Sequence, residues 1–102
     1  MKKDPVYPNP RLYVGTYRID FTEESSAKMA VFMATFGHGH NVKFEIHPEH
    51  GNMTIDCELG PDNIVNRLAI VNLRDRNIKD PLTTLWAHAY ETALRLSGGK
   101  IQ

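Results

Sequence analysis

A β-hairpin over residues 41–58 is the feature that most restricts how this sequence can fold. Apolar and polar residues alternate over 42–46 and again over 53–57, on either side of a turn at 48–52. Alternation with a period of two places every second side chain on one face of a strand, and a short turn with Gly and Pro joins antiparallel neighbours. The expected buried face of the hairpin consists of Val42, Phe44, Ile46, Met53, Ile55 and Cys57.

A helix is predicted before the hairpin. Thr22 can cap it, and its first residues, Glu23 and Glu24, carry charges that suit the positive end of a helix dipole. Gly37 is expected to end it. The apolar stripe expected to be buried is Ala27, Ala30, Val31 and Ala34, widened by Met29, Phe32, Met33 and Phe36.

Two further helices are predicted after the hairpin. Pro61 can open the first of them, and Asp80 can cap the second, which Pro81 opens and Gly98-Gly99 ends. Apolar residues recur at helical spacing in both segments. They are Ile64, Val65, Leu68, Ala69 and Val71 in the first, and Leu82, Leu85, Trp86, Ala89, Tyr90, Ala93 and Leu94 in the second.

The order of these elements predicts the fold class. Residues 1–10, rich in proline, are expected to form an irregular arm, and residues 11–21 alternate as a single strand. Strand, helix, two strands and two helices predict an α+β fold, an antiparallel sheet with helices packed on one face. A chain of 102 residues can form one core, so 11–102 are expected to be one domain. A sheet of few strands leaves open edges, which favours a homo-oligomer.

Composition excludes several classes of function. Twelve basic residues balance twelve acidic ones, so there is no net field with which to hold nucleic acid. No stretch of about 18 apolar residues is present, which argues against a membrane segment. The single cysteine, Cys57, cannot form an internal disulfide, and its place in the strand pattern predicts a buried structural thiol. A cytoplasmic location is expected.

His38 and His40 form the one run that is typical of a metal site. They lie two residues apart at the entrance to a strand, so their imidazoles are expected on the same side of the sheet. Imidazole suits zinc, which makes zinc the expected metal. The alternative is that the glycine-rich run is simply a turn. The other histidines, His47, His50 and His88, are expected at the surface.

A family resemblance depends on several runs in a fixed order. They are Gly37-His38-Gly39-His40-Asn41, Gly51-Asn52-Met53-Thr54-Ile55-Asp56, Leu73-Arg74-Asp75-Arg76-Asn77-Ile78 and Pro81-Leu82-Thr83-Thr84. Over residues 37–95 this order resembles the pyruvoyl-tetrahydropterin and carboxytetrahydropterin synthase family. Members of that family read Gly-His-Gly-His-Asn-Tyr, a strand, Gly-Met-Val-Met-Asp, a helix, and then Leu-Asp-His-Lys-Asn-Leu.

The resemblance implies a tunnelling fold, in which sheets from several subunits close into a barrel and pterin-like ligands bind between subunits. It implies zinc on His38 and His40, and a lyase acting on a dihydroneopterin-type substrate. It also implies a catalytic role for Asp75, which stands at the acid of the family's Asp-His pair. Without the family, Asp75 is expected to be a helix-end charge paired with Arg74 or Arg76.

The chain departs from the family in its catalytic set. No histidine follows Phe21, where the family takes its third zinc ligand, so that ligand is expected from Glu23, Glu24 or another subunit. The family's cysteine before the His run is absent, and Arg76 replaces its proton-transferring histidine, which an arginine cannot imitate. No counterpart of the family's terminal strand, whose glutamate anchors the pterin ring, is expected.

Three hypotheses of function follow. The first is a divergent pterin-synthase-like protein that binds a metal and a pterin or purine-like ligand with an incomplete catalytic set; if active, it is a zinc-dependent lyase. The second is a non-catalytic oligomeric binding or regulatory module on the same scaffold. The third is an unrelated small α+β interaction protein.

Overall fold

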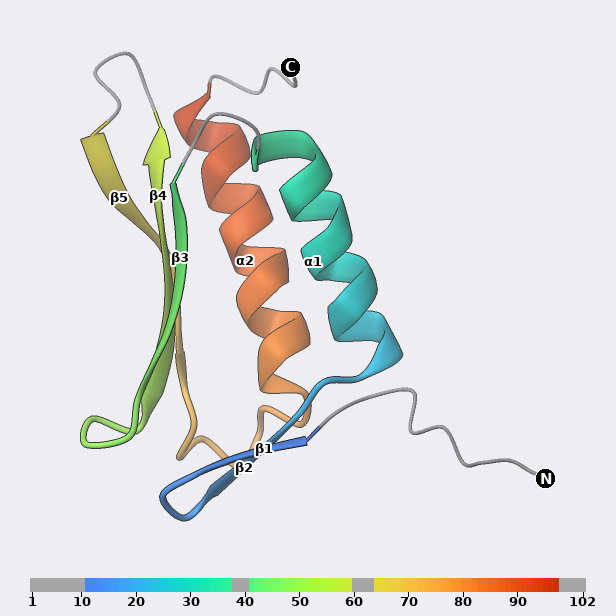
Figure 1. The fold of residues 1–102 in the computed structure, drawn as a ribbon, viewed down its shortest axis with the longest axis vertical. Helices are drawn as coiled ribbons and strands as arrows, with labels where there is room; N and C mark the ends of the chain where they lie inside the picture. Colours follow the sequence, from blue (N-terminus) through green and yellow to red (C-terminus); the bar gives the residue numbers. More distant parts are fainter. Residues whose placement is uncertain (1–10, 38–40, 60–63, 98–102) are drawn as a thin grey trace, which may run out of the picture.

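The computed structural model describes residues 11–37, 41–59 and 64–97 as a three-stranded sheet, two helices and a separate small hairpin. The elements are β1 (Arg11–Val14), β2 (Tyr17–Asp20), α1 (Glu23–Phe36), β3 (Val42–His47), β4 (Asn52–Leu59), β5 (Ile64–Asn72) and α2 (Pro81–Leu96). The sheet is antiparallel in the order β3-β4-β5, and both helices lie on the same side of it (Figure 1). The predicted α+β class is therefore confirmed. None of the described helices is long and apolar enough to cross a membrane.

The central hairpin forms as predicted, with antiparallel strands. Phe44 of β3 lies opposite Ile55 of β4, and Val42 lies opposite Cys57, so the apolar sets of the two strands share one face. Gly51 closes the connection with a φ of 69°, a left-handed conformation that glycine adopts without a steric penalty. Its amide donates a hydrogen bond to the His47 carbonyl at 2.8 Å.

The helix predicted after Pro61 is wrong, because this segment forms strand β5. It pairs antiparallel with β4 from Asn52↔Asn72 to Leu59↔Ile64, with a register shift between Ile55 and Asp56. At such a bulge one strand contributes an extra residue, and the period of two is broken. Leu68 and Ala69 are consequently both buried although they are consecutive, and this spacing imitates a helical stripe.

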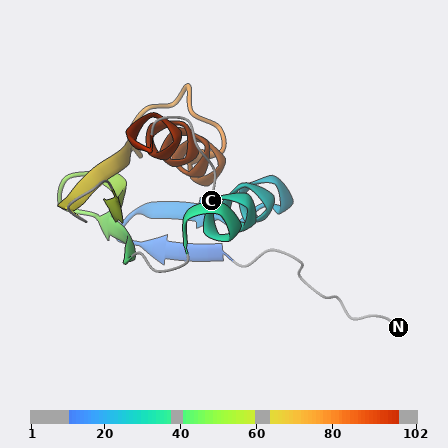
Figure 2. The same cartoon turned by 90° about the horizontal axis from the view of Figure 1, so that it is seen from above.

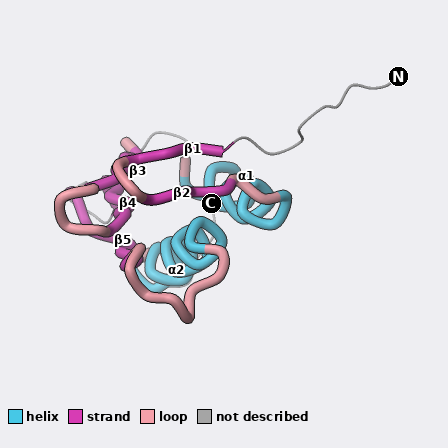
Figure 3. The backbone as a smooth tube through the Cα atoms, turned by 90° about the horizontal axis from the view of Figure 1, so that it is seen from below, coloured by secondary structure: helices cyan, strands magenta, loops and turns pink. Residues whose placement is uncertain are grey.

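Residues 11–21 form a hairpin rather than the predicted single strand. Val14 pairs with Tyr17, so only Gly15 and Thr16 connect β1 to β2. Gly15 has a φ of 61°, and two-residue hairpin loops need such positive angles. The hairpin lies at the end of the molecule where both helices begin (Figures 1 and 3). The predicted arm, 1–10, lies outside the described residues.

The limits of α1 are as predicted, but its buried face is not. Thr22 accepts a hydrogen bond from the Ser25 amide at 3.0 Å, and Gly37 caps the other end. The predicted stripe is exposed: Ala27, Ala30, Val31 and Ala34 all face solvent. Phe32 and Phe36 are buried instead, because α1 packs along one narrow line against α2 and its largest side chains fill that line.

The two helices begin side by side at a shared polar contact. Asp80 caps α2 by accepting a hydrogen bond from the Thr83 amide at 3.3 Å, as predicted. The Thr22 hydroxyl, which caps α1, donates to Asp80 at 2.7 Å. Each cap satisfies backbone N–H groups that have no partner within the helix. The hydrogen bond between Thr22 and Asp80 holds the first turns of α1 and α2 side by side. The predicted stop at Gly98-Gly99 lies outside the described residues.

Aromatic side chains join both helices to the sheet. The ring centroids of Phe32 and Trp86 are 5.4 Å apart, and those of Trp86 and Phe44 are 6.1 Å apart. Phe36 extends this set to Phe32 at 5.5 Å and to Tyr90 at 5.6 Å. These are the tilted and edge-to-face geometries that aromatic pairs prefer. Figure 2 shows the arrangement from above, with α2 lying closer than α1 to β5.

Replacement of Phe32 tests this core. Phe32→Ala removes a completely buried ring and is expected to lower the free energy of unfolding by about 3–5 kcal/mol. Met33→Ala is the matched control, because the neighbouring Met33 is 39% exposed and its loss should cost less than ~1 kcal/mol. Urea denaturation followed by circular dichroism measures both. Equal losses for the two variants would contradict the packing described.

Candidate functional site

The predicted metal ligands, His38 and His40, lie outside the described residues. The elements on either side are those predicted, since α1 ends at Phe36 and β3 begins at Val42. Glu23 and Glu24 start α1, whereas the histidines follow its other end. The expected third ligand, from Glu23, Glu24 or another subunit, stays a prediction. Within the described residues, no group of three or more His, Cys, Asp and Glu side chains could hold a metal ion.

Asp75, the predicted catalytic residue, lies in an exposed turn after β5. Its Oδ1 accepts a hydrogen bond from the Asn77 amide at 3.0 Å, and its own amide donates to the Asn72 carbonyl at 3.2 Å. The expected helix end is absent here because a strand precedes the turn. The neighbouring Arg74 binds the Tyr17 hydroxyl at 2.9 Å rather than Asp75. The visible contacts of Asp75 shape the turn, and its catalytic role stays a prediction.

Cys57 is the buried structural thiol that the sequence predicts. It is 0% exposed and lies in the core face of β4. Burial raises the pKa of its thiol, and the nearby charge of Glu58 raises it further. A raised pKa leaves less thiolate near neutral pH, and thiolate is the nucleophilic form. Cys57 is therefore poorly suited to replace the missing catalytic cysteine of the family.

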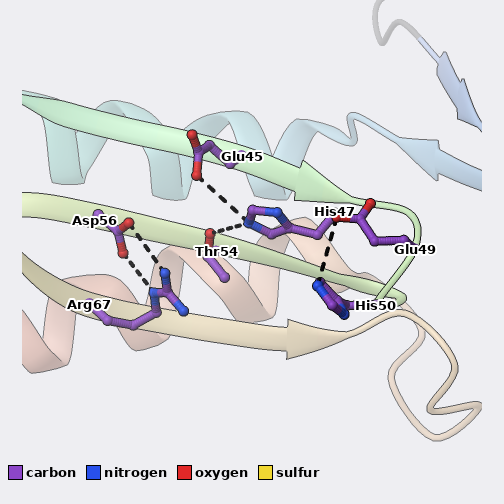
Figure 4. A network of polar contacts seen from close by, with 7 residues as sticks. All are labelled: Glu45, His47, Glu49, His50, Thr54, Asp56 and Arg67. Atoms are coloured by element: carbon purple, nitrogen blue, oxygen red, sulfur yellow. Dashed lines mark hydrogen bonds and ion pairs between the residues drawn. The ribbon is translucent and has the colours of Figure 1, made fainter.

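The sheet face opposite the helices carries polar side chains in pairs (Figure 4). His47 Nε2 lies 3.1 Å from the Thr54 hydroxyl and 3.7 Å from Glu45. Asp56 accepts from Arg67 Nε at 2.7 Å, and this bond raises the pKa of the guanidinium. His47 is thus partly covered rather than fully solvated. With each of these groups already paired, this stretch of the face is organised for structure rather than for catalysis.

Strand β5 forms one edge of the sheet and is unusually apolar for an edge. It pairs only with β4 among the described strands, so its outer backbone groups have no strand partner there. Ile64, Val65 and Ile70 are 59%, 58% and 54% exposed. Soluble proteins normally protect an edge with charge, proline or a covering element, since a bare edge is a template for another strand.

A groove runs beside this edge between β5 and α2. It has a volume of about 400 Å³ and includes Arg67 and Ile70 on the strand side. His88, Glu91 and Arg95 contribute from the helix. The expected surface position of His88 is confirmed. The groove thus combines an open strand edge, exposed apolar side chains and both signs of charge, which are the elements of a site for an extended chain.

The sequence prediction missed the groove because it treated residues 64–71 as a helix. The available signal was the set of β-branched residues, since Ile64, Val65, Ile70 and Val71 favour a strand. No spacing rule connects them to His88 or Arg95, which the tertiary fold brings alongside.

Comparison with protein-family models, with curated proteins and with solved structures finds no match. The fold and the candidate site therefore define this chain only as an α+β protein with an open sheet edge beside a mixed-charge groove.

Thiol labelling tests the placement of Cys57. Native protein at neutral pH is expected to react with a thiol reagent far more slowly than unfolded protein, because the thiol is buried and its pKa is raised. Absorbance of the released chromophore follows the reaction, and urea-unfolded protein provides the full signal. Rapid labelling of the folded protein would show that Cys57 is accessible and could act as a nucleophile.

Proposed function

We propose that this protein is an interaction module that associates with a second copy of itself through the β5 edge. The observation that supports this most directly is that the nine-residue edge strand β5 exposes three large apolar side chains, those of Ile64, Val65 and Ile70. Antiparallel pairing of two β5 strands joins two three-stranded sheets into one and satisfies the outward backbone groups of both edges.

The charge pattern of the two edge strands favours β5 over β3 as the contact. β3 carries Lys43, Glu45 and His47 along its open face, and such charges protect an edge. β5 carries a single charged residue, Arg67, which is already bonded to Asp56. Two β5 strands can therefore approach without placing several like charges opposite one another.

The groove beside β5 supports a second copy as the partner. It contains two arginines, Arg67 and Arg95, and one glutamate, Glu91. A surface with both signs of charge can be complementary to a rotated copy of itself, which a two-fold dimer requires. The net charge of the chain is zero, so two copies meet without overall repulsion.

This proposal corresponds to an oligomeric module without catalysis, whether the scaffold is that of the pterin synthases or an unrelated one. A tunnelling fold would also extend its sheet across subunits, which is consistent with an open edge. The missing third histidine and the buried Cys57 both favour binding over turnover.

Charged substitutions on β5 test the dimer. Val65→Lys combined with Ile70→Lys places like charges at the contact and is expected to raise the dimer dissociation constant by about tenfold or more. Sedimentation velocity over a range of concentrations measures it. Both side chains are exposed, so the melting temperature should change little.

The matched control is Val31→Lys, a change of the same kind on α1, at a position that borders a hollow with Trp86 and Tyr90 of α2. Val31 is 50% exposed and lies away from the sheet edge, so this variant should associate like the unaltered chain. A chain that stays monomeric at high micromolar concentration, or a dimer lost with Val31→Lys and kept with the β5 variant, would refute the proposal.

A second candidate function is zinc binding by His38 and His40, with a pterin or purine-like ligand at a subunit interface. It is favoured by the position of the run, directly between the end of α1 and the start of β3. The third ligand would come from Glu23, Glu24 or another subunit.

Metal analysis separates this second function from simple association. The purified protein is expected to hold about one zinc per subunit, and His38→Ala with His40→Ala should remove it. His47→Ala with His50→Ala is the control pair. Zinc content near zero in the unaltered oligomer, prepared without chelators, would rule this function out.

A further inference from the structure

A second hollow lies at the end of the sheet where the β3–β4 turn, the end of β5 and the following turn meet. It has a volume of about 350 Å³ and is lined by His50, Asn52, Ile70, Asn72 and Arg74. Asn52 and Asn72 are direct partners across β4 and β5. Four of these side chains can donate hydrogen bonds, and the fifth, Ile70, is apolar. None of the residues that line the hollow carries a carboxylate.

Arg74 is held in place by contacts outside the hollow. Its Nε donates to the Tyr17 hydroxyl of β2 at 2.9 Å, and its backbone amide donates to Asn72 Oδ1 at 2.9 Å. The guanidinium passes close over Gly51, where an added Cβ would lie 2.7 Å from Arg74 Nε and 2.9 Å from the Tyr17 hydroxyl. A side chain at position 51 would displace this pair, so the glycine makes room for the arginine.

The guanidinium keeps most of its donors for another partner. An arginine has five N–H groups, and the bond to Tyr17 uses only the one on Nε. Within the ranges that the structure describes, the ion pairs involve Arg18, Arg67, His47 and His50, and Arg74 is in none of them. The Asn72 side-chain oxygen is occupied by the Arg74 amide, which leaves its NH₂ group as a donor.

We propose that this hollow binds a small oxyanion, a phosphate or a carboxylate, attached to an apolar body. The terminal N–H groups of Arg74 suit such an anion, since guanidinium and oxyanion form paired, charge-assisted hydrogen bonds. The amides of Asn52 and Asn72 supply further donors, and Ile70 supplies the apolar contact. Two acids lie near by: Glu49, 3.8 Å from the His50 ring, and Asp75, which binds the Asn77 amide.

This proposal goes beyond self-association, and its hydrogen-bond donors lie outside the proposed β5 contact, apart from Asn72 at the end of the strand. The hollow is on the open face at the end of the strands, and its central residue belongs to the turn after β5. Ile70 is shared with the proposed dimer contact, whereas Arg74, Tyr17 and Gly51 are not. Arg74→Ala therefore tests the anion site without altering the dimer contact, and the two proposals can fail separately.

The test is a titration of the full chain with phenyl phosphate, benzoate and inorganic phosphate at low salt, followed by NMR. Phenyl phosphate is expected to bind with a dissociation constant of about 1 mM or tighter and to shift the Arg74 Nε–H and the Asn52 and Asn72 amide signals. Inorganic phosphate should bind more weakly because it lacks the apolar body. Comparison of benzoate with phenyl phosphate shows which oxyanion the site prefers.

Two arginine variants give the matched comparison. Arg74→Ala should weaken phenyl phosphate binding at least about tenfold, whereas Arg76→Ala, with the same change of charge two residues away, should not. Tyr17→Phe should weaken binding several-fold and shift the Arg74 Nε–H signal of the free protein, since Tyr17 is a positioning residue. The proposal is overturned if none of the three probes shifts the Arg74 signal, or if Arg76→Ala weakens binding as much as Arg74→Ala.

Discussion

The structure depends on the aromatic contact that runs from α1 through α2 to the sheet. Phe32 contacts Trp86, and Trp86 contacts Phe44, so each of the three layers is joined to the next by a large ring. Among the described residues the sheet has three strands, and both helices lie on one of its faces. The hydrophobic core of the described residues therefore lies on one side of the sheet.

This one-sided packing explains where the functional features lie. The opposite sheet face carries polar pairs such as Asp56 and Arg67, and the outer edge of β5 has no strand partner among the described strands. An edge with exposed Val65 and Ile70 is compatible with solubility when another strand pairs with it. The hollow around Arg74 is on the same uncovered side, where a ligand can approach.

Local signals predicted the parts of this fold that local physics decides. The caps at Thr22 and Asp80 and the alternation around Phe44 were sufficient for two helices and the central hairpin. The bulge that buries both Leu68 and Ala69 could not be seen in the sequence, because it depends on pairing with β4. The candidate sites could not be predicted for the same reason. His38 and His40 lie close together in the sequence and can be recognised there, whereas the groove beside β5 and the hollow around Arg74 combine residues from distant segments.

Hydrogen exchange at β5 tests most directly whether a second copy completes the sheet. The amides of Ile64–Asn72 that point away from β4 are expected to exchange slowly at high protein concentration and to lose this protection on dilution, while the amides bonded to β4 stay protected. Outward amides that exchange rapidly and at the same rate at every concentration would show that the edge stays unpaired, and would contradict association through β5.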